Sequence, residues 1–407
     1  MKVGDTCEVL NLTELVLLDR DKLPDGLKST LENIAEKEGY ATYDITNRTI
    51  SVGGSYMAVL YVADIKGKVN NKEEETSLFI KHAITQDNVK IMNVSEIYWK
   101  ELFVYGELSK IFEELENEAV IPPDKRYKLV KFYKESNTDA IILQNLAKEG
   151  YSTVYRMGVM PLKFAELSVQ QLARFHALSF VIEQKRPEYF KRKIKSLKTS
   201  QIFNDDFNKY CENTFKLSVS GLDERRKRML EGKFPEYLEL YKQYIASDEG
   251  KIKCLCHGDY RMNNILMKTT NGIINEVIPV DFQLLYYGLP MIDLIYLIYS
   301  STDKEFRDKH LKALKDLYFD TMENYLQYFA IDINSVYPRK QMEADYDDCL
   351  KYGLQIMLLM MPYTFSVENY EPDLNKSDLF DITLNLDRTY YDRLNGVIDD
   401  MIEYGKL

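Results

Sequence analysis

The spacing of apolar residues changes twice along the 407-residue chain. Residues 11–17 and 26–38 carry apolar side chains at helical spacing, so we expect helices before about residue 45. Residues 43–52 and 57–65 are instead rich in Val, Ile, Tyr and Thr, which favour β-strands. Helical spacing returns beyond about residue 150, most clearly in residues 164–180. The pattern predicts an α+β protein in which a small β-rich part precedes a larger, mainly helical part.

Three further apolar segments extend the predicted sheet. Residues 77–81, 127–133 and 140–143 are expected to be strands, which brings the sheet to five strands. The charged residues 66–76 predict an exposed turn between two of these strands. A helix is expected from about residue 94, because Asn93 and Glu96 have the spacing of a capping box.

Several polar residues lie close together in the chain after residue 253. An apolar run ends at Cys256 and is followed by His-Gly-Asp at 257–259, and Asn264 is the fifth residue after the aspartate. Asp281 follows two short apolar runs that are separated by Asn-Gly at 271–272, a dipeptide typical of a tight hairpin. We expect this hairpin to bring Asn264 and Asp281 side by side.

The spacing of these residues suits phosphoryl transfer, because an asparagine stands five residues after the aspartate in a kinase catalytic loop. Asp259 would take the proton of an acceptor hydroxyl, and Asn264 and Asp281 would offer oxygen ligands to Mg²⁺. His257 is expected to orient the loop rather than to titrate. Each short motif alone also fits a surface turn or a capped strand end. The combination favours the catalytic interpretation.

The same stretch resembles a known family. Residues 257–301 contain HGDYRMNNILMK and PVDFQLLYYGLPMIDLIYLIYSS, and resemble the ecdysteroid kinase-like, or choline kinase-like (CHK), small-molecule kinases of insects, within the aminoglycoside and choline phosphotransferase superfamily. The resemblance runs from about residue 53 to the mid-360s. It implies a protein-kinase-like fold of two lobes and ATP-dependent phosphorylation of a small-molecule hydroxyl. We place the N-lobe, with a helical extension, at residues 1–145 and the helical C-lobe at 146–407.

The resemblance also implies an ATP site with Mg²⁺ as cofactor. Lys81 closes a strand, as the lysine that contacts the α- and β-phosphates does in kinases. Glu101 is its expected partner, since a carboxylate in an otherwise apolar helix face needs one; Glu107 is the alternative. The phosphate-binding loop and the hinge that faces adenine are implied at Gly53, Gly54 and Ser55, and at Gln144, Asn145 and Leu146, respectively.

Other family-like positions have structural or open roles. His176 is expected to be a packed, hydrogen-bonded histidine, and Asp293, at the start of an apolar helix, is expected to brace the catalytic loop. Arg261 departs from the tryptophan common in the family, and contact with the acceptor, with a phosphate or with solvent all remain open. Residues 181–250 are expected to be helical and to wall the acceptor site.

The acceptor itself has several candidates. The leading hypothesis is an ecdysteroid or a similar hydrophobic or xenobiotic alcohol. A choline- or ethanolamine-type kinase is an alternative, since 31 tyrosines and 18 phenylalanines permit an aromatic cage, although core packing explains aromatic residues too. Met357, Met360 and Met361 are assigned to core filling, with the lining of a plastic pocket as the alternative. A ligand-binding protein of the pseudokinase type is the hypothesis from another class. A protein kinase is disfavoured, because HRD, DFG and APE motifs are missing.

Charge, apolar runs and cysteine pattern disfavour several classes of partner. A net charge of −11 argues against nucleic-acid binding. The first residues do not have the pattern of a secretory signal, and no apolar run approaches the roughly 18 residues of a membrane span. Five cysteines form neither a metal-ligand nor a disulfide pattern. We therefore expect a cytoplasmic monomer that acts on a small-molecule alcohol, with no nucleic-acid partner and no membrane span.

Overall fold

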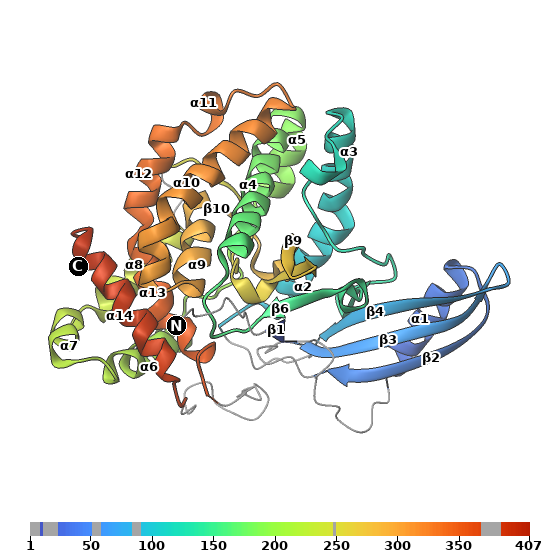
Figure 1. Cartoon of the computed structure of the whole chain (residues 1–407), viewed down its shortest axis with the longest axis horizontal. Coiled ribbons are helices and arrows are strands. Elements are labelled where there is room, and N and C mark those ends of the chain that lie inside the picture. The colour runs from blue at the N-terminus through green and yellow to red at the C-terminus, as the bar shows by residue number, and fades with distance from the viewer. Residues whose placement is uncertain (1–8, 11–22, 51–57, 84–90, 247–249, 368–383) are drawn as a thin grey trace.

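The computed structural model describes residues 9–10, 23–50, 58–83, 91–246, 250–367 and 384–407. The helix predicted at residues 11–17 lies outside these ranges. Within them, a small antiparallel sheet with its helices is followed by a larger, mainly helical part (Figure 1). The predicted α+β fold of two unequal parts is confirmed, and the boundary at residues 145–146 stays a prediction.

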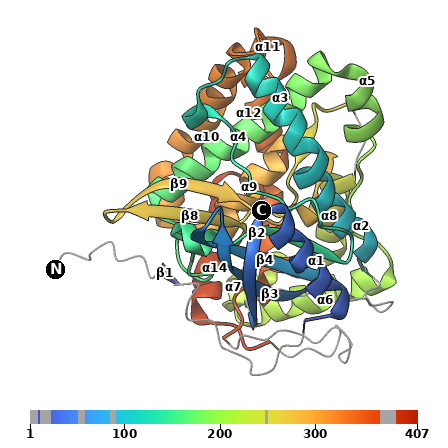
Figure 2. The same ribbon diagram turned by 90° about the vertical axis from the view of Figure 1, so that its right-hand side faces the viewer.

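Four antiparallel strands form the first sheet. Their order is β2 (Tyr40–Ile50), β3 (Ala58–Val69), β4 (Lys72–Ala83) and β5 (Ala140–Gln144). Helix α1 (Asp25–Lys37) lies along this sheet in both views (Figures 1 and 2). Its Leu31 and Ile34 share an apolar cluster with Ile65, Leu78 and Ile80 of the strands. Burial of this helix face anchors the predicted helix at residues 26–38.

The exposed turn expected at residues 66–76 is much shorter than predicted. Strands β3 and β4 continue through this segment and reverse only at residues 70–71, whose φ angles are 51° and 64°. Lys66 lies opposite Glu75 in the register, with their charged atoms 3.6 Å apart. Opposite charges across two strands stabilise a solvated ribbon, so a highly charged segment remains extended.

Residues 127–133 are not a fifth strand of the sheet. They touch β5 through a single bridge, between Phe132 and Leu143, and through two adjacent backbone hydrogen bonds. The backbone N–H of Tyr127 donates instead to the Glu116 carboxylate, at 2.8 Å. The segment turns away from the sheet because the helical part satisfies its backbone.

A helical rod lies where the sheet meets the larger part (Figure 1). It consists of α2 (Val94–Phe103), the π-helix η1 (Val104–Leu108) and α3 (Ser109–Glu118). The Asn93 side chain accepts a hydrogen bond from the backbone N–H of Glu96, at 3.2 Å. The helix start predicted at residue 94 is therefore confirmed, with Asn93 as its cap. The reciprocal half of the capping box is not formed, because the N–H of Asn93 donates to the Ser200 carbonyl and the Glu96 carboxylate pairs with Lys100.

One apolar core joins the helices of the larger part. It includes α4 (Leu162–Lys185) and α9 (Pro290–Ser301), and every residue of α9 is buried. Two small antiparallel sheets lie beside these helices, β1 (Val9–Leu10), β6 (Tyr151–Val154), β8 (Ile265–Thr270) and β9 (Ile273–Pro279), and β10 (Tyr286–Gly288) with β7 (Cys254–Cys256). The other helices are α5 (Pro187–Tyr189), α6 (Asp205–Ser220), α7 (Glu224–Leu230), α8 (Phe234–Ala246), α10 (Lys304–Gln327), α11 (Ile333–Val336), α12 (Arg339–Cys349), α13 (Lys351–Leu359) and α14 (Arg388–Glu403). Among the described residues, no helix is both long and apolar enough to cross a membrane.

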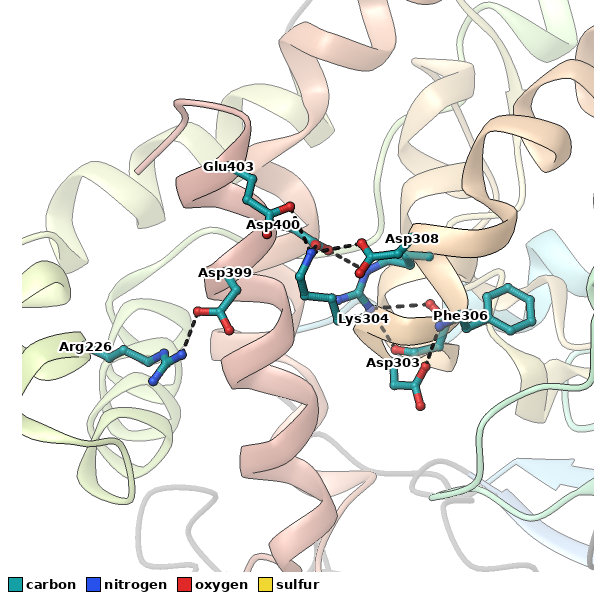
Figure 3. Close-up of polar contacts among 10 residues, drawn as sticks. Arg226, Asp303, Lys304, Phe306, Asp308, Asp399, Asp400 and Glu403 are labelled. Carbon is teal, nitrogen blue, oxygen red and sulfur yellow. Dashed lines mark hydrogen bonds and ion pairs between the residues drawn. The ribbon is translucent and has the colours of Figure 1, made fainter. Parts of the chain in front are cut away.

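Ion pairs fix the last helix to α10 (Figure 3). The Lys304 ammonium lies 2.9 Å from Asp308, 3.1 Å from Asp400 and 2.9 Å from Glu403. The buried Arg307 guanidinium pairs with Asp400 at 2.5 Å. Three carboxylates at such distances could hold a metal ion. Here a lysine ammonium already lies among them, so the cluster has a structural role in docking α14.

Candidate active site

The loop that follows β7 is held by a buried aspartate of α9. Asp293 accepts the backbone N–H of His257 at 2.6 Å and that of Gly258 at 3.0 Å. His176 donates from Nε2 to the same carboxylate, at 3.2 Å, and its Nδ1 lies 2.6 Å from the Tyr318 hydroxyl. The expected bracing by Asp293 and the packed, hydrogen-bonded state of His176 are both present. Three donors on one carboxylate fix the position of the loop.

Gly258 is required by its backbone and by its surroundings. Its φ is +82°, and a Cβ atom would lie 2.2 Å from the carbonyl oxygen of Leu284. A side chain at this position would displace the loop or the segment after Asp281. The glycine therefore lets two parts of the site approach closely.

The hydrogen bonds of His257 define its tautomer. Its Nε2 lies 3.0 Å from the Val280 carbonyl, which can only accept, and its Nδ1 accepts the backbone N–H of Asp259 at 3.3 Å. Burial lowers the pKa of His257 and outweighs the opposing effect of nearby carboxylates, among them Asp293 and Asp259. A neutral imidazole with the proton on Nε2 satisfies both contacts. His257 thus links the loop to the end of β9.

Asp259 and Asn264 lie together on this loop. The Asn264 amide donates to the Asp259 carboxylate at 2.7 Å and to its backbone carbonyl at 3.0 Å. The Asn264 carbonyl accepts the N–H of Val280 at 2.9 Å, so the β8–β9 hairpin extends to the residue before Asp281. Arg261 forms an ion pair with Asp259 at 3.2 Å and donates to the Thr364 hydroxyl at 3.0 Å.

A cluster of charges, with Lys81 and Glu101 buried and Asp281 half-buried, lies at the junction of the two parts. The Lys81 ammonium, on β4, is 2.9 Å from Glu101 of α2 and 2.6 Å from Asp281. The expected contact between Lys81 and Glu101 is therefore present. Glu107, the alternative partner, lies 3.5 Å from Lys193 instead.

Burial and charge act against each other in this cluster. Burial alone would lower the pKa of Lys81, but the charges of Asp281 and Glu101 outweigh it and raise that pKa above its ordinary value. Burial raises the pKa of Glu101 to about 7, with Lys81 acting in the opposite direction. For Asp281, burial is outweighed by Lys81, and the pKa is lowered. Of the two carboxylates in this cluster, Asp281 has the lowered pKa and is the one held in the ionised form.

The backbone at Asp281 is unusual for a residue with a side chain. Its φ and ψ are 69° and 63°, in the left-handed region, which costs a non-glycine residue roughly 1–2 kcal/mol. With its amide oriented so that both atoms are satisfied, Gln283 donates to Asp281 at 3.1 Å and accepts from Lys81 at 3.2 Å. These contacts hold Asp281 in its strained conformation.

The donor set fits a hard divalent cation. Asp281 offers an ionised carboxylate, and Asn264, whose Nδ2 is occupied by Asp259, offers its carboxamide oxygen. Magnesium favours such oxygen ligands together with substrate phosphates. The two residues could hold Mg²⁺ beside a triphosphate that contacts Lys81.

The hinge segment begins at the end of β5. Asn145 donates its backbone N–H to the Ser77 carbonyl and its side-chain amide to the Ser77 hydroxyl, both at 2.9 Å. Gln144 donates to Glu149 at 3.2 Å, and the buried Leu146 opens the short helix η3 (Leu146–Glu149). These two donors of Asn145 serve the fold, and the contact of the hinge with adenine stays a prediction. The predicted phosphate-loop residues Gly53, Gly54 and Ser55 lie outside the described residues.

A cavity of about 180 Å³ opens beside Asp259. Its wall is made mainly of aromatic and aliphatic side chains, and its polar groups include Asp259, Arg261 and Gln201. Two pairs of tyrosines stack in the wall, with ring centroids 5.8 Å and 5.5 Å apart. The aromatic lining residues are Phe207, Tyr210, Tyr241, Tyr286, Tyr296, Tyr352 and Tyr363.

Several lining residues come from segments without a chemical motif. Residues 181–250 contribute part of the cavity wall through α6 and α8, and their role at an acceptor site stays a prediction. Met357 is fully buried, as core filling predicts, whereas Met360 and Met361 line the cavity. Met360 fits the pocket alternative, whereas Met361 is buried in the core and also lines the cavity. Tyr296 and Gln201 were not predicted, because nothing in the spacing of either residue marks it.

Comparison with known proteins identifies the same family as the sequence motifs. A family model described as the ecdysteroid kinase-like family matches residues 52–330. No curated protein matches this chain in sequence. Similar solved structures include a Ralstonia eutropha protein assigned as an aminoglycoside phosphotransferase, with 13% identity, coverage of 93% of this chain and 98% of that chain, and a TM-score of 0.42. Another is Plasmodium vivax ethanolamine kinase, with 12% identity, coverage of 89% and 81%, and a TM-score of 0.39. Similarities this low carry no information on activity. The family match spans well over half of the sequence, and the chain therefore belongs to the ecdysteroid kinase-like family.

Proposed function

We propose that this protein is an ATP- and Mg²⁺-dependent kinase that phosphorylates a hydroxyl group of a hydrophobic small molecule, such as an ecdysteroid or a xenobiotic alcohol. The observation that carries the proposal is the position of Asp259. Its carboxylate lines the aromatic cavity and contacts Asn264, on a loop that is hydrogen-bonded to the strand leading to Asp281. Family membership supports a small-molecule phosphotransferase.

In the proposed reaction, the acceptor hydroxyl donates a hydrogen bond to Asp259. Its oxygen forms a bond to the γ-phosphorus as the bond to the β-phosphate oxygen breaks, ADP leaves, and the hydroxyl proton passes to Asp259. Lys81, held by Glu101, neutralises charge on the α- and β-phosphates. Bound Mg²⁺, held by Asp281 and Asn264, would neutralise phosphate oxygens.

The cavity favours a neutral, apolar acceptor over a choline-like amine. Tyrosine and methionine side chains provide a broad apolar contact surface. The Arg261 guanidinium also lines this cavity and pairs with Asp259. A cationic acceptor would approach a like charge there, and the carboxylate that could bind it is already paired.

We also propose that the protein works as a cytoplasmic monomer. The four described cysteines, Cys211, Cys254, Cys256 and Cys349, are free and buried, which supports a reducing compartment.

The proposal is tested by transfer of labelled γ-phosphate from ATP to a panel of ecdysteroids, choline-like amines and plant phenolic glycosides, with and without Mg²⁺. Labelled product from a hydrophobic alcohol, only with Mg²⁺, is expected. Labelling of the amines alone would replace the proposed acceptor class with the choline type. Mg²⁺-dependent ATP binding without any product would favour the ligand-binding alternative.

A further inference from the structure

A buried lysine lies next to Glu101 on the same helix. The Lys100 side chain has 0% exposure, and its ammonium has three acceptors, matching its three N–H bonds. They are the Lys198 carbonyl at 2.5 Å, the Ser200 hydroxyl at 2.6 Å and the Glu96 carboxylate at 2.9 Å. Two of the three belong to a segment about 100 residues away in the chain.

That segment is part of the cavity wall. Thr199 and Gln201 line the cavity, and the Gln201 amide donates to the hydroxyl of Tyr241, another lining residue, at 3.0 Å. The backbone of residues 200–202 pairs with the chain that enters α2. Here Asn93 donates to the Ser200 carbonyl at 3.1 Å, and Ile202 donates to the Ile91 carbonyl at 2.9 Å.

A different side of α2 contacts the charge cluster. Successive residues of a helix are rotated by about 100°, so Lys100 and Glu101 project in different directions. Glu101 contacts Lys81, and α2 packs against η6 (Phe282–Leu284), the turn that follows Asp281. One rigid helix therefore contacts the wall of the acceptor cavity and the proposed nucleotide site.

Burying the charged ammonium of Lys100 costs desolvation free energy. Burial lowers the pKa of Lys100, and its bonds to Glu96 only partly oppose that effect. A methionine would fill a similar volume without desolvating a charge. What the ammonium adds is direction. Its bonds to the Lys198 carbonyl and the Ser200 hydroxyl join α2 to residues 198–200, while Glu96 of the same helix accepts the third N–H.

We propose that Lys100 is a positioning residue that couples the acceptor cavity to the nucleotide site, by holding α2 in the position where Glu101 meets Lys81. The inference rests on the proposed function, in which Lys81 binds the nucleotide. By reciprocity, an acceptor that orders residues 198–202 would strengthen nucleotide binding, and the nucleotide would strengthen acceptor binding by the same factor.

The test compares Mg·ATP affinity, measured by titration calorimetry, in wild type, Lys100→Met, Ser200→Ala and the double variant. Lys110→Met, which changes an exposed lysine on the adjoining helix α3, is the matched control. Hydrogen exchange of residues 94–103 and 198–202 is followed in the same proteins. A purely structural role would lower the melting temperature and leave the Mg·ATP affinity of the folded protein unchanged.

Coupling predicts that Lys100→Met weakens Mg·ATP binding by about tenfold, within the usual range for linked sites. Ser200→Ala should weaken it less, and the double variant should equal Lys100→Met, because both changes break one connection. Exchange should rise in both segments together, and Lys110→Met should match wild type. Unchanged affinity in folded Lys100→Met, or additive effects in the double variant, would overturn the inference.

The test still decides the question if Lys100→Met does not fold or if wild type does not bind Mg·ATP. If Lys100→Met does not fold, the affinity and exchange of Ser200→Ala decide the question, since Ser200→Ala removes only one acceptor. If wild type binds no Mg·ATP, the proposed function fails. The exchange data then show independently whether Lys100 links the two segments.

Discussion

Replacement of Asp293 by asparagine tests how the catalytic loop is held. The carboxylate is fully buried and accepts the backbone N–H groups of His257 and Gly258. In Asp293→Asn one acceptor oxygen becomes an NH₂ group, so one of these N–H groups loses its acceptor. An unpaired buried N–H costs roughly 1–3 kcal/mol. The two donors that remain, one backbone N–H and His176, then bind a neutral instead of a charged acceptor, which costs about 1 kcal/mol more.

The expected loss of unfolding free energy is therefore about 3 kcal/mol, a large fraction of the roughly 5–15 kcal/mol typical of folded proteins. Urea denaturation measures it, followed by circular dichroism and by the fluorescence of Trp99, the only tryptophan in the sequence. Turnover should fall as well, because the loop that carries Asp259 loses its anchor.

Asp303→Asn is the matched control. Asp303 caps α10 by accepting the N–H of Phe306 at 2.8 Å, and asparagine caps helices as well as aspartate does. This control should stay within about 0.5 kcal/mol of wild type, the usual range of surface substitutions. If Asp293→Asn were no less stable than Asp303→Asn, the anchoring role of Asp293 would be refuted.

Three further predictions concern the same site. Gly258→Ala should abolish turnover and lower the melting temperature, because its Cβ would meet the Leu284 carbonyl at a positive φ; a variant with wild-type activity and melting temperature would contradict this. Asp281→Ala should remove Mg²⁺-dependent ATP binding in calorimetry, and retention of that binding would exclude Asp281 as a ligand. Turnover should rise with pH through about 7, where Glu101 ionises and pairs fully with Lys81, and Glu101→Gln should lose this step in the pH profile. The pKa of Glu101 is raised on folding, so its contribution to stability is complete below about 4.5 and is lost as pH rises through about 7.

Much of the fold and the central motif could be predicted from local patterns in the sequence. Apolar periodicity located α1, α2 and α4, and Asn93 marked the start of α2, because these signals depend on neighbouring residues alone. The residues after β7 could be recognised for the same reason, since the loop from Asp259 to Asn264 and the Asn-Gly hairpin are compact in sequence.

Features that depend on distant partners could not be found in this way. The charged residues 66–76 were expected to turn, but apart from residues 70–71 they are extended, with Lys66 paired to Glu75 across the two strands. Residues 127–133 have strand composition, yet Glu116 takes a backbone donor away from the sheet. The cavity and the Lys100 contacts bring together residues from separate helices, and no spacing along the chain encodes them.

The most direct test of the central claim is the Asp259→Asn variant. With the acceptor identified by the transfer panel, Mg·ATP affinity and turnover are measured side by side in this variant and in wild type. The proposed base predicts unchanged Mg·ATP affinity and a loss of turnover of roughly 100-fold or more. Equal turnover in the two proteins would contradict the assignment of Asp259 as the residue that accepts the hydroxyl proton.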